Sequence, residues 1–374
     1  MRQTELNIIS FDNPYPPNYG GVVDVFYKIK ALHEVGCIIH LHCFVKEIPT
    51  EFEELKKYCK SIYFYESTRN PFHFFNRMPF SVISRSNPKL VENIVKTNAP
   101  VLFEGLKTTC LVRDIRLLDH KKFLRQHNIE HNYYNGIANS EESFLKKMAM
   151  YRESSKYRKY ESVLAEFEKV FTLSEFENDY CNKKFHNAEY IPVFHGNATI
   201  ANLNGFGQYA FYHGDLNTSD NRKAVVFLIS VFEKNPEYNL VIAAGSNEEF
   251  VRNQIGSSLN IEFIKLTNHS QLLELFKEAH INICWSFQKS GTKLKLINSL
   301  FNSRFCVIND NIIDDEKVEQ LCEKVSDEQQ LMETIKSLFT RPYEVSDARK
   351  EILESRLNDL QNANQLMKAI FGND

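Results

Sequence analysis

Short apolar runs alternate with amphipathic helical patterns along almost the whole chain, and this alternation strongly constrains the fold. In the first half, strand-like runs lie at 6–11, 37–44, 61–65, 100–105 and 122–128, followed by 170–174 and 188–194. Helical patterns separate many of them, as at 22–35, where apolar residues recur on one face. Strands separated by helices favour parallel sheets covered on both faces. The sequence therefore predicts an α/β protein with doubly wound sheets.

The alternation is interrupted once, at the turn-rich stretch HGNATIANLNGFGQ over 195–208. A second series follows, with apolar runs at 209–215, 239–245, 261–266 and 281–287. A chain of 374 residues is too long for one ordinary core. We predict two Rossmann-like domains, 1–195 and 206–343, separated by a cleft, and a single charged amphipathic helix over 344–374.

Composition excludes several classes of function. A net charge of −3 and a pI near 6.5 give no sign of nucleic-acid binding. The eight cysteines form no CxxC pair, so we expect reduced thiols and no zinc site. No apolar run approaches the roughly 18 residues that span a bilayer. The N-terminus lacks the apolar core of a signal peptide, which predicts a cytoplasmic protein.

Two glycine-containing loops follow predicted strands, where open α/β sheets bind ligands. Pro14–Gly21 contains Gly20 and Gly21, which allow the backbone to approach a ligand closely. In the second half, Gly214 ends a strand, and Lys223 lies near the start of the next helix. Taken alone, each loop is better explained as an ordinary surface loop without a ligand. Another glycine pattern, G-x-G-x-x-A at Gly205–Ala210, precedes a strand and therefore does not predict a dinucleotide site.

The stretch QKSGTKLKLINSLFNSRFCVIND, over 288–310, predicts a turn, a helix and a strand. Lys293 and Lys295 lie at the start of this helix, where the helix dipole is already positive. A bound anion explains this arrangement, and an exposed polar face of Lys295, Asn298 and Asn302 explains it without a ligand. Because three such loops recur after strands, we favour an anion site.

The stretch RQHNIEHNYYNGIA, over 125–138, follows a strand and contains His127, Asn128, Glu130 and His131. The i, i+4 spacing of the two histidines suits a metal pair, but no third ligand lies nearby in the sequence. We therefore predict a substrate-handling loop and no metal. A basic and aromatic segment over 69–85 fits both an anionic membrane surface and a partly buried loop.

Together these motifs resemble those of GT-B glycosyltransferases, most closely the retaining "group 1" type (family four) of surface-polysaccharide assembly. The likeness covers nearly the whole chain. Its most specific parts are Gly-Thr-Lys-Leu-Lys at 291–295 and His-Asn-Ile-Glu at 127–130. It implies a cytoplasmic, metal-independent transferase without a cofactor. A UDP- or GDP-type sugar would be the donor, and a saccharide or lipid-linked molecule the acceptor. The basic and aromatic segment over 69–85 separately suggests a peripheral contact with the inner membrane surface.

The resemblance also implies roles for individual residues. Lys293 and Lys295 would clamp the diphosphate, with His127 near the sugar, and these three are the expected catalytic residues. Asn128 and Glu130 would position the acceptor. The final helix would cross back to the first domain. The remaining expected donor-binding residues are Gly20, Gly21, Gly214, Lys223, Ser290, Gly291, Thr292 and Asn298.

Two departures from the family pattern leave alternatives open. The family often carries Glu-x7-Glu, and here those positions are Ser290 and Asn298. Asp215 stands where some relatives have a basic residue. A neutral amide lacks the charge-assisted hydrogen bond of a carboxylate, and an acid pointing inward would oppose phosphate binding. The alternatives are a non-catalytic GT-B paralogue that binds a partner, and a GT-B sugar-nucleotide epimerase.

Overall fold

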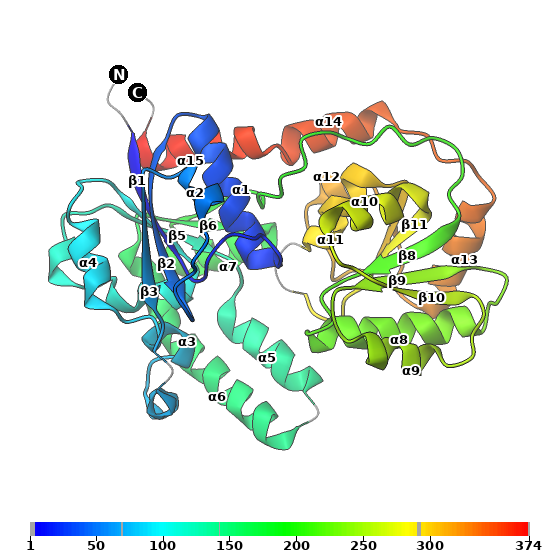
Figure 1. Ribbon diagram of the computed structural model, residues 1–374, viewed down its shortest axis with the longest axis horizontal. Helices are drawn as coiled ribbons and strands as arrows, with labels where there is room; N and C mark the ends of the chain where they lie inside the picture. Colours follow the sequence, from blue (N-terminus) through cyan, green and yellow to red (C-terminus); the bar gives the residue numbers. More distant parts are fainter. Residues whose placement is uncertain (1–3, 69, 142, 290–292, 373–374) are drawn as a thin grey trace. The chain divides into compact units, whose positions relative to one another are not determined.

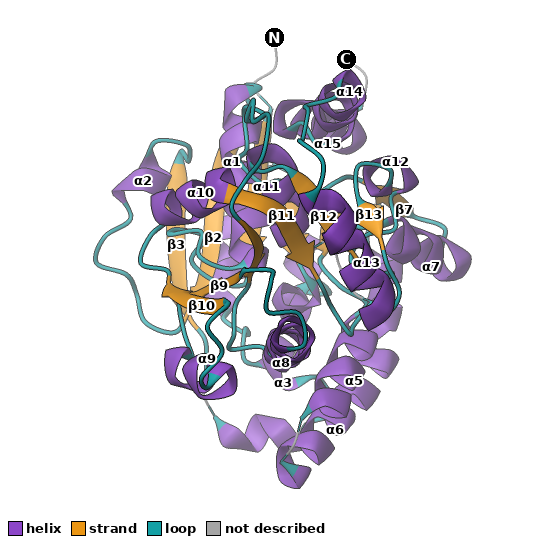
Figure 2. Cartoon of the chain, turned by 90° about the vertical axis from the view of Figure 1, so that its right-hand side faces the viewer, coloured by secondary structure: helices purple, strands orange, loops and turns teal. Residues whose placement is uncertain are grey.

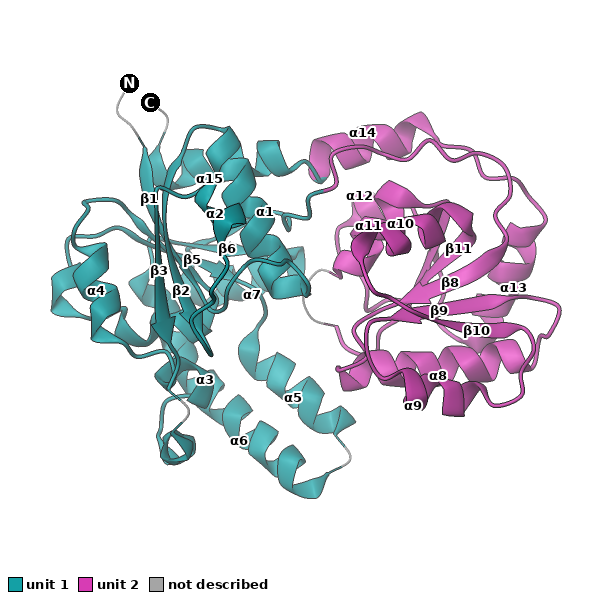
Figure 3. Ribbon diagram, viewed as in Figure 1, with its two compact units in different colours: residues 1–196, 357–374 teal, residues 197–356 magenta. Residues whose placement is uncertain are grey.

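The computed structural model describes residues 4–68, 70–141, 143–289 and 293–372. It forms two compact units, residues 1–196 with 357–374, and residues 197–356 (Figure 3). Ser290, Gly291 and Thr292 lie outside the described residues.

The first unit contains a parallel sheet whose described strands follow the order β3-β2-β1-β4-β5-β6-β7. The order reverses between β1 and β4, as in a Rossmann fold. The strands inside the sheet are short and mostly buried, as expected for a sheet covered on both faces, whereas the edge strands β3 and β7 are only partly buried. The strands are β1 (Glu5–Ser10), β2 (Ile38–Val45), β3 (Ser61–Glu66), β4 (Val101–Glu104), β5 (Lys122–Gln126), β6 (Lys169–Thr172) and β7 (Ala188–Tyr190).

Helices cover both faces of this sheet (Figure 1). One face packs against α1 (Gly20–Glu34), whose apolar stripe is buried, together with α15 (Asp359–Phe371). The other face buries Val82, Leu90, Tyr157 and Cys181. The remaining helices of this unit are α2 (Glu53–Lys56), α3 (Phe80–Ile83), α4 (Pro88–Ile94), α5 (Glu130–Ser140), α6 (Phe144–Tyr160) and α7 (Glu175–Phe185). In the described part of this unit, 3-10 helices lie at Pro71–Phe75, Leu106–Leu111, Ile115–Leu117 and Glu161–Glu166.

The second unit repeats the plan with the described strand order β10-β9-β8-β11-β12-β13. Its strands are β8 (Tyr209–His213), β9 (Leu240–Ala244), β10 (Ile261–Lys265), β11 (Ala279–Cys284), β12 (Phe305–Ile308) and β13 (Glu323–Lys324). The predicted fold class, two doubly wound Rossmann-like sheets, is confirmed.

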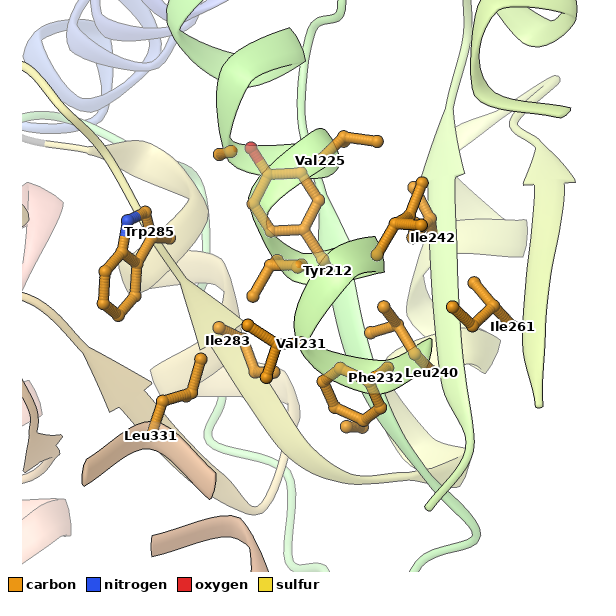
Figure 4. Packing of buried hydrophobic residues seen from close by; sticks show 14 of the residues in the cluster. Tyr212, Val225, Val231, Phe232, Leu240, Ile242, Ile261, Ile283, Trp285 and Leu331 are labelled. Atoms are coloured by element: carbon orange, nitrogen blue, oxygen red, sulfur yellow. The ribbon is translucent and has the colours of Figure 1, made fainter. Parts of the chain in front are cut away.

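Alternation along the strands divides the core of the second unit into two layers. Tyr212 and Ile242 point to the face covered by α8 (Ser219–Glu233), α9 (Glu248–Ile255) and α13 (Glu328–Phe339) (Figure 4). α8 and α9 lie together on that face (Figure 2). Phe211 and Val241 point the other way, toward α10 (His269–Glu278). The other helices of this unit are α11 (Leu294–Asn302), α12 (Glu316–Glu319) and α14 (Asp347–Arg356).

The C-terminal segment predicted as one helix over 344–374 forms two helices, α14 in the second unit and α15 in the first. Asn358 caps α15 by accepting hydrogen bonds from the amides of Leu360 and Gln361. α15 then packs along α1 through Ala363, Leu366 and Ile370. The chain therefore contributes its last helix to the core of the unit in which it began.

A second local prediction was also wrong: the stretch predicted as a loop over 125–138 is helical from Glu130 onward. Asn and Gly lower intrinsic helix propensity, but α5 packs closely against α6, and tertiary packing decides the structure. Among the described residues, no helix is both long enough and apolar enough to cross a membrane.

Candidate functional site

Two loops at the carboxyl edge of the second sheet are joined by Asp220, in the first turn of α8. Its carboxylate accepts a hydrogen bond from Ser286 Oγ at 2.7 Å and another from the amide of Phe287 at 2.8 Å. The loop after β8 and the loop after β11 are therefore fixed to each other. In open α/β sheets this edge is where ligands bind.

Lys295, in the first turn of α11, reaches into this edge. Its Nζ lies 2.9 Å from the main-chain oxygen of Trp285, 3.2 Å from Asn221 Oδ1 and 3.4 Å from Tyr212 Oη. Tyr212 and Trp285 belong to the buried cluster on the α8 side of the sheet (Figure 4). Burial away from water lowers the pKa of Lys295 to about 8. The Lys295 ammonium is therefore charged and held in place at pH 7, and its pKa lies only a little above that pH.

The adjacent His213 does not add to this charge. It is the last residue of β8, and burial together with the charge of Lys295 lowers the pKa of His213 to about 3. Its Nε2 atom is buried without a hydrogen-bond partner among the described residues. Lys295 therefore sits beside a neutral imidazole.

The structure places three other predicted donor residues around the same edge. A Cβ on Gly214 would lie 3.1 Å from Asn221 Nδ2, so this glycine allows the close approach of the β8 loop to α8. Lys223 is exposed on α8, with its Nζ 4.2 Å from the centre of the Phe287 ring. Lys293 directly precedes α11 as its N-cap residue.

Asn298 is engaged elsewhere on α11. Its Oδ1 accepts a hydrogen bond from Asn197 Nδ2 at 3.0 Å, and Asn302 Nδ2 donates to Asn197 Oδ1 at 2.8 Å. Asn298 and Asn302 therefore bind the segment that begins the second unit. This contact explains the polar face of α11 without a ligand. Asn298 Nδ2 makes no hydrogen bond to another residue in the described part of the chain.

Asp215 turns into its own loop, where its exposed carboxylate accepts a hydrogen bond from the amide of Asn217 at 3.0 Å. This interaction is an Asx turn, which gives the side chain a local structural role.

In the first unit, Gly20 and Gly21 begin α1, and the side chain of the N-cap residue, Tyr19, makes no capping hydrogen bond. A Cβ on Gly21 would lie 2.7 Å from Cζ of Phe11, which shows why glycine is needed there. The Phe11 ring meets the His127 ring edge to face, with centroids 5.4 Å apart. Gly21 and His127 are therefore linked through one aromatic ring at the carboxyl edge of the first sheet.

The predicted residues around His127 have separate partners. His127 Nε2 lies 3.0 Å from Glu104 Oε2, whereas His131 Nδ1 faces Glu161 Oε1 at 3.4 Å. The two histidines thus form no metal pair. Asn128 is half-buried, and its main-chain oxygen accepts a hydrogen bond from Gln126. Glu130 is buried in the first turn of α5, where the helix dipole favours a carboxylate, and its Oε2 has no hydrogen-bond partner among the described residues.

Sequence reasoning missed a network of buried charged side chains beside His127. Asp24 and Lys28 from α1, Glu104 from β4 and Arg125 from β5 are all fully buried. Lys28 Nζ lies 2.9 Å from Asp24 and 2.8 Å from Glu104, and Arg125 Nη2 lies 2.9 Å from Asp24. The two carboxylates and two cations offset each other's charge, as burial requires.

The signal for this network was present in the sequence. Asp24 and Lys28 interrupt the apolar pattern of the helix at an i, i+4 spacing, and Glu104 and Arg125 are charged residues inside apolar strands. Alternation along the strands places Leu102 with Glu104, and Phe123 with Arg125, on the face that α1 covers. Charged residues at core-facing positions could therefore have identified the cluster.

Comparisons with known proteins agree on the architecture. A sucrose-phosphate synthase from Thermosynechococcus elongatus matches with a TM-score of 0.65 and 14% identity, covering 98% of this chain and 95% of that chain. A mutant of Staphylococcus aureus TarM, solved with fondaparinux, α-GlcNAc-glycerol and UDP, matches with a TM-score of 0.64 and 10% identity, covering 98% of this chain and all of that chain. The chain has the GT-B fold.

A curated relative is similar in sequence. An uncharacterized 44.6 kDa protein in the cps region of Klebsiella pneumoniae is 26% identical over 327 residues, covering 81% of this chain and 82% of the relative. No protein-family model matches the chain.

Proposed function

We propose that this GT-B protein is a retaining glycosyltransferase of the family-four type. It would transfer a sugar from a UDP- or GDP-sugar to a saccharide or lipid-linked acceptor, without a metal ion. The observation that carries the proposal is the position of Lys295, a cation with a lowered pKa at the carboxyl edge of the second sheet.

The chemistry explains why such a cation would help. As a glycosidic bond to a nucleotide breaks, negative charge grows on the leaving diphosphate. A cation that is already held in place stabilises this charge in the transition state more than in the ground state. Lys293 and Lys223 would add charge near the diphosphate, and Gly214 would let the backbone approach it. Ser290, Gly291 and Thr292 would complete the donor loop, and Asn298 would bind the ribose.

In the first unit, His127 would contact the sugar, with Gly20 and Gly21 near the diphosphate and Asn128 and Glu130 near the acceptor. The relative in a cps region supports a role in surface polysaccharide biosynthesis. The UDP bound by TarM supports a nucleotide sugar as donor.

Calorimetric titration with UDP, GDP, ADP and CMP, with no metal added, tests the proposal. We expect one nucleotide to bind the wild type, and Lys295→Ala to abolish that binding. Lys336→Ala, which removes an exposed lysine on α13, is the matched control and should bind like the wild type. A nucleotide at about 100 times its Kd should also stabilise the fold by about 2.7 kcal/mol in thermal melting.

A non-catalytic GT-B paralogue is the second candidate, and the contacts of Lys295 favour it. An ammonium group has three hydrogen-bond donors, and three protein acceptors already surround Nζ. Asp215 adds no positive charge to the neighbouring loop. This candidate predicts that no nucleotide binds. Consumption of a nucleotide sugar without an acceptor would instead indicate an epimerase.

The proposed acceptor side includes an anionic lipid surface. α6 carries six basic side chains and one acidic one, in a chain whose net charge is −3. Lys156 is buried and pairs with the acid, Glu153, and the other five basic side chains are not buried. At its start Phe144 and Leu145 are 72% and 79% exposed. The 3-10 helix Pro71–Phe75 contacts α6, since Arg152 lies over the rings of Phe74 and Phe75. Exposed apolar side chains among cations suit the interface of an anionic bilayer.

Co-sedimentation with vesicles tests this contact. We expect binding to phosphatidylglycerol–phosphatidylcholine vesicles, weak binding to phosphatidylcholine alone, and loss of binding in Phe144→Ser/Leu145→Ser and in Lys146→Glu/Lys147→Glu. The matched control is Lys121→Glu, which changes an exposed lysine outside α6. Absence of binding to either vesicle would remove the lipid surface from the proposal.

A further inference from the structure

The Glu104 carboxylate lies between the Lys28 ammonium and the His127 ring. On one side the ammonium of Lys28 lies 2.8 Å from Oε1 and 2.9 Å from Oε2. On the other side His127 Nε2 lies 3.0 Å from Oε2. Glu104 ends β4 and is fully buried, so its side chain has little freedom to leave this position.

These contacts define which ring nitrogen of His127 carries a proton. An ionised carboxylate only accepts hydrogen bonds, so the Nε2 atom of His127 must be the donor. The Nδ1 atom makes no hydrogen bond to another residue in the described part of the chain. Phe11 packs against the ring at 90°, and 10% of the His127 side chain remains exposed. The ring is thus oriented from two sides and has one nitrogen left for a ligand.

A metal ion is a competing explanation for this cluster. Asp24, Glu104 and His127 offer ligand atoms within 4.8 Å of one another. However, Lys28 Nζ is within 2.9 Å of both carboxylates and already supplies the cation that they require. A metal ion would have to displace a fully buried ammonium. The arrangement therefore favours a protein-only hydrogen-bond chain.

We propose that Glu104, anchored by Lys28, is a positioning residue that fixes His127 in the Nε2–H form, so that Nδ1 accepts a hydrogen bond from a hydroxyl group of the saccharide substrate. The role of the hydroxyl rests on the proposed function, whereas the orientation of the ring does not. A carboxylate that orients an imidazole in this way sets both its tautomer and its direction.

Glu104→Gln tests the proposal because it keeps the shape of the side chain and removes its charge. A glutamine places its amide nitrogen beside the Lys28 ammonium in either orientation, and it offers His127 at best a neutral carbonyl oxygen in place of the carboxylate. We expect His127 to lose the uniform Nε2–H form, which two-bond 1H–15N spectra of histidine-labelled protein report directly. The His127 signals are assigned by their absence in His127→Gln. We also expect kcat to fall about tenfold or more, with KM changed less than about threefold.

The matched control is Asp24→Asn, which removes an equally buried charge from the same network but lies 3.9 Å from His127 Nε2. We expect it to lower Tm as Glu104→Gln does, while the Nε2–H form of His127 persists. An Nδ1–H form in the wild type would overturn the proposal. So would an unchanged tautomer in folded Glu104→Gln, whatever its activity. If the wild type has no transferase activity, the proposed function fails and the spectra still decide the orientation of His127.

Discussion

Lys295 Nζ lies 2.9 Å from the main-chain oxygen of Trp285, and this contact joins the start of α11 to the end of β11. The carbonyl compensates only in part for the loss of water around the ammonium, and burial lowers the pKa of Lys295 to about 8. A group tuned in this way responds to pH in a range that binding experiments readily reach.

We expect nucleotide affinity to fall as pH rises from 7 to about 9.5. Lys295 loses its proton above about pH 8, and a bound diphosphate favours the protonated form, so binding above that pH requires uptake of one proton. The affinity should therefore fall by at most about tenfold per pH unit. Calorimetry across this range should show the slope in the wild type and its absence in Lys295→Met. An equal slope in both proteins would assign the titration to another group.

The same pKa shift has a consequence for stability, with a defined sign. The unfolded chain keeps the Lys295 proton up to its ordinary pKa of 10.5, whereas the folded chain loses it near pH 8. Between these values the unfolded state binds more protons, so this group makes the folded state gain stability as pH rises. In urea unfolding, the free-energy difference between wild type and Lys295→Met should shift in favour of the wild type over this range.

Substitutions at Asn298 separate a ribose contact from a structural one. Asn197 holds Oδ1 of Asn298 and leaves Nδ2 for a ligand hydroxyl. We expect Asn298→Ala to weaken nucleotide binding by about 1 kcal/mol. Asn298→Asp should bind the nucleotide at least as well as the wild type, because a carboxylate accepts hydrogen bonds from both Asn197 Nδ2 and the ribose hydroxyl. Asn302→Ala, which removes the other contact with Asn197, should lower Tm without changing Kd. Wild-type affinity in Asn298→Ala would exclude the ribose contact.

The fold was predictable because strand and helix periods are local properties of the sequence. The runs at 6–11 and 209–215 form the first strand, in sequence order, of each sheet. Gly20, Gly214 and Lys295 lie near the carboxyl edges, as expected. These edges exist because the strands are parallel, and the reversal of strand order opens a crevice at them, as is general in such sheets.

The partners of individual side chains were not predictable, because they come from distant parts of the chain. The helical spacing places Asn298 on a polar face of its helix, but nothing in the local sequence indicates that Asn197 donates a hydrogen bond to it. Glu104 and Lys28 are 76 residues apart and meet only because β4 lies beside β1, beneath α1. Helix α5 was missed for the same reason, since its packing against α6 outweighs weak local propensity.

Gly205 and Gly207 lie in the same G-x-G-x-x-A pattern but should respond differently to substitution. A Cβ on Gly207 would lie 2.4 Å from the backbone nitrogen of His280, which cannot move without disturbing β11. Gly207→Ala should therefore cost about 3 kcal/mol. At Gly205 the φ of +75° strains an alanine, but the space is open, so the cost should be about 1 kcal/mol. Urea unfolding of both variants measures the difference, and equal costs would contradict the close-packing role of Gly207.

Gly21→Ala should disturb His127 without touching it. The new Cβ would lie 2.7 Å from Cζ of Phe11, so the ring must move, at a cost of about 1–2 kcal/mol. Phe11 also packs edge to face on His127, and its displacement should lower kcat. The double variant Phe11→Leu/Gly21→Ala relieves the overlap but does not restore the aromatic contact. We therefore expect it to recover stability relative to Gly21→Ala, while activity stays low. Recovery of both would show that Phe11 supports packing alone and that Glu104 suffices to orient His127.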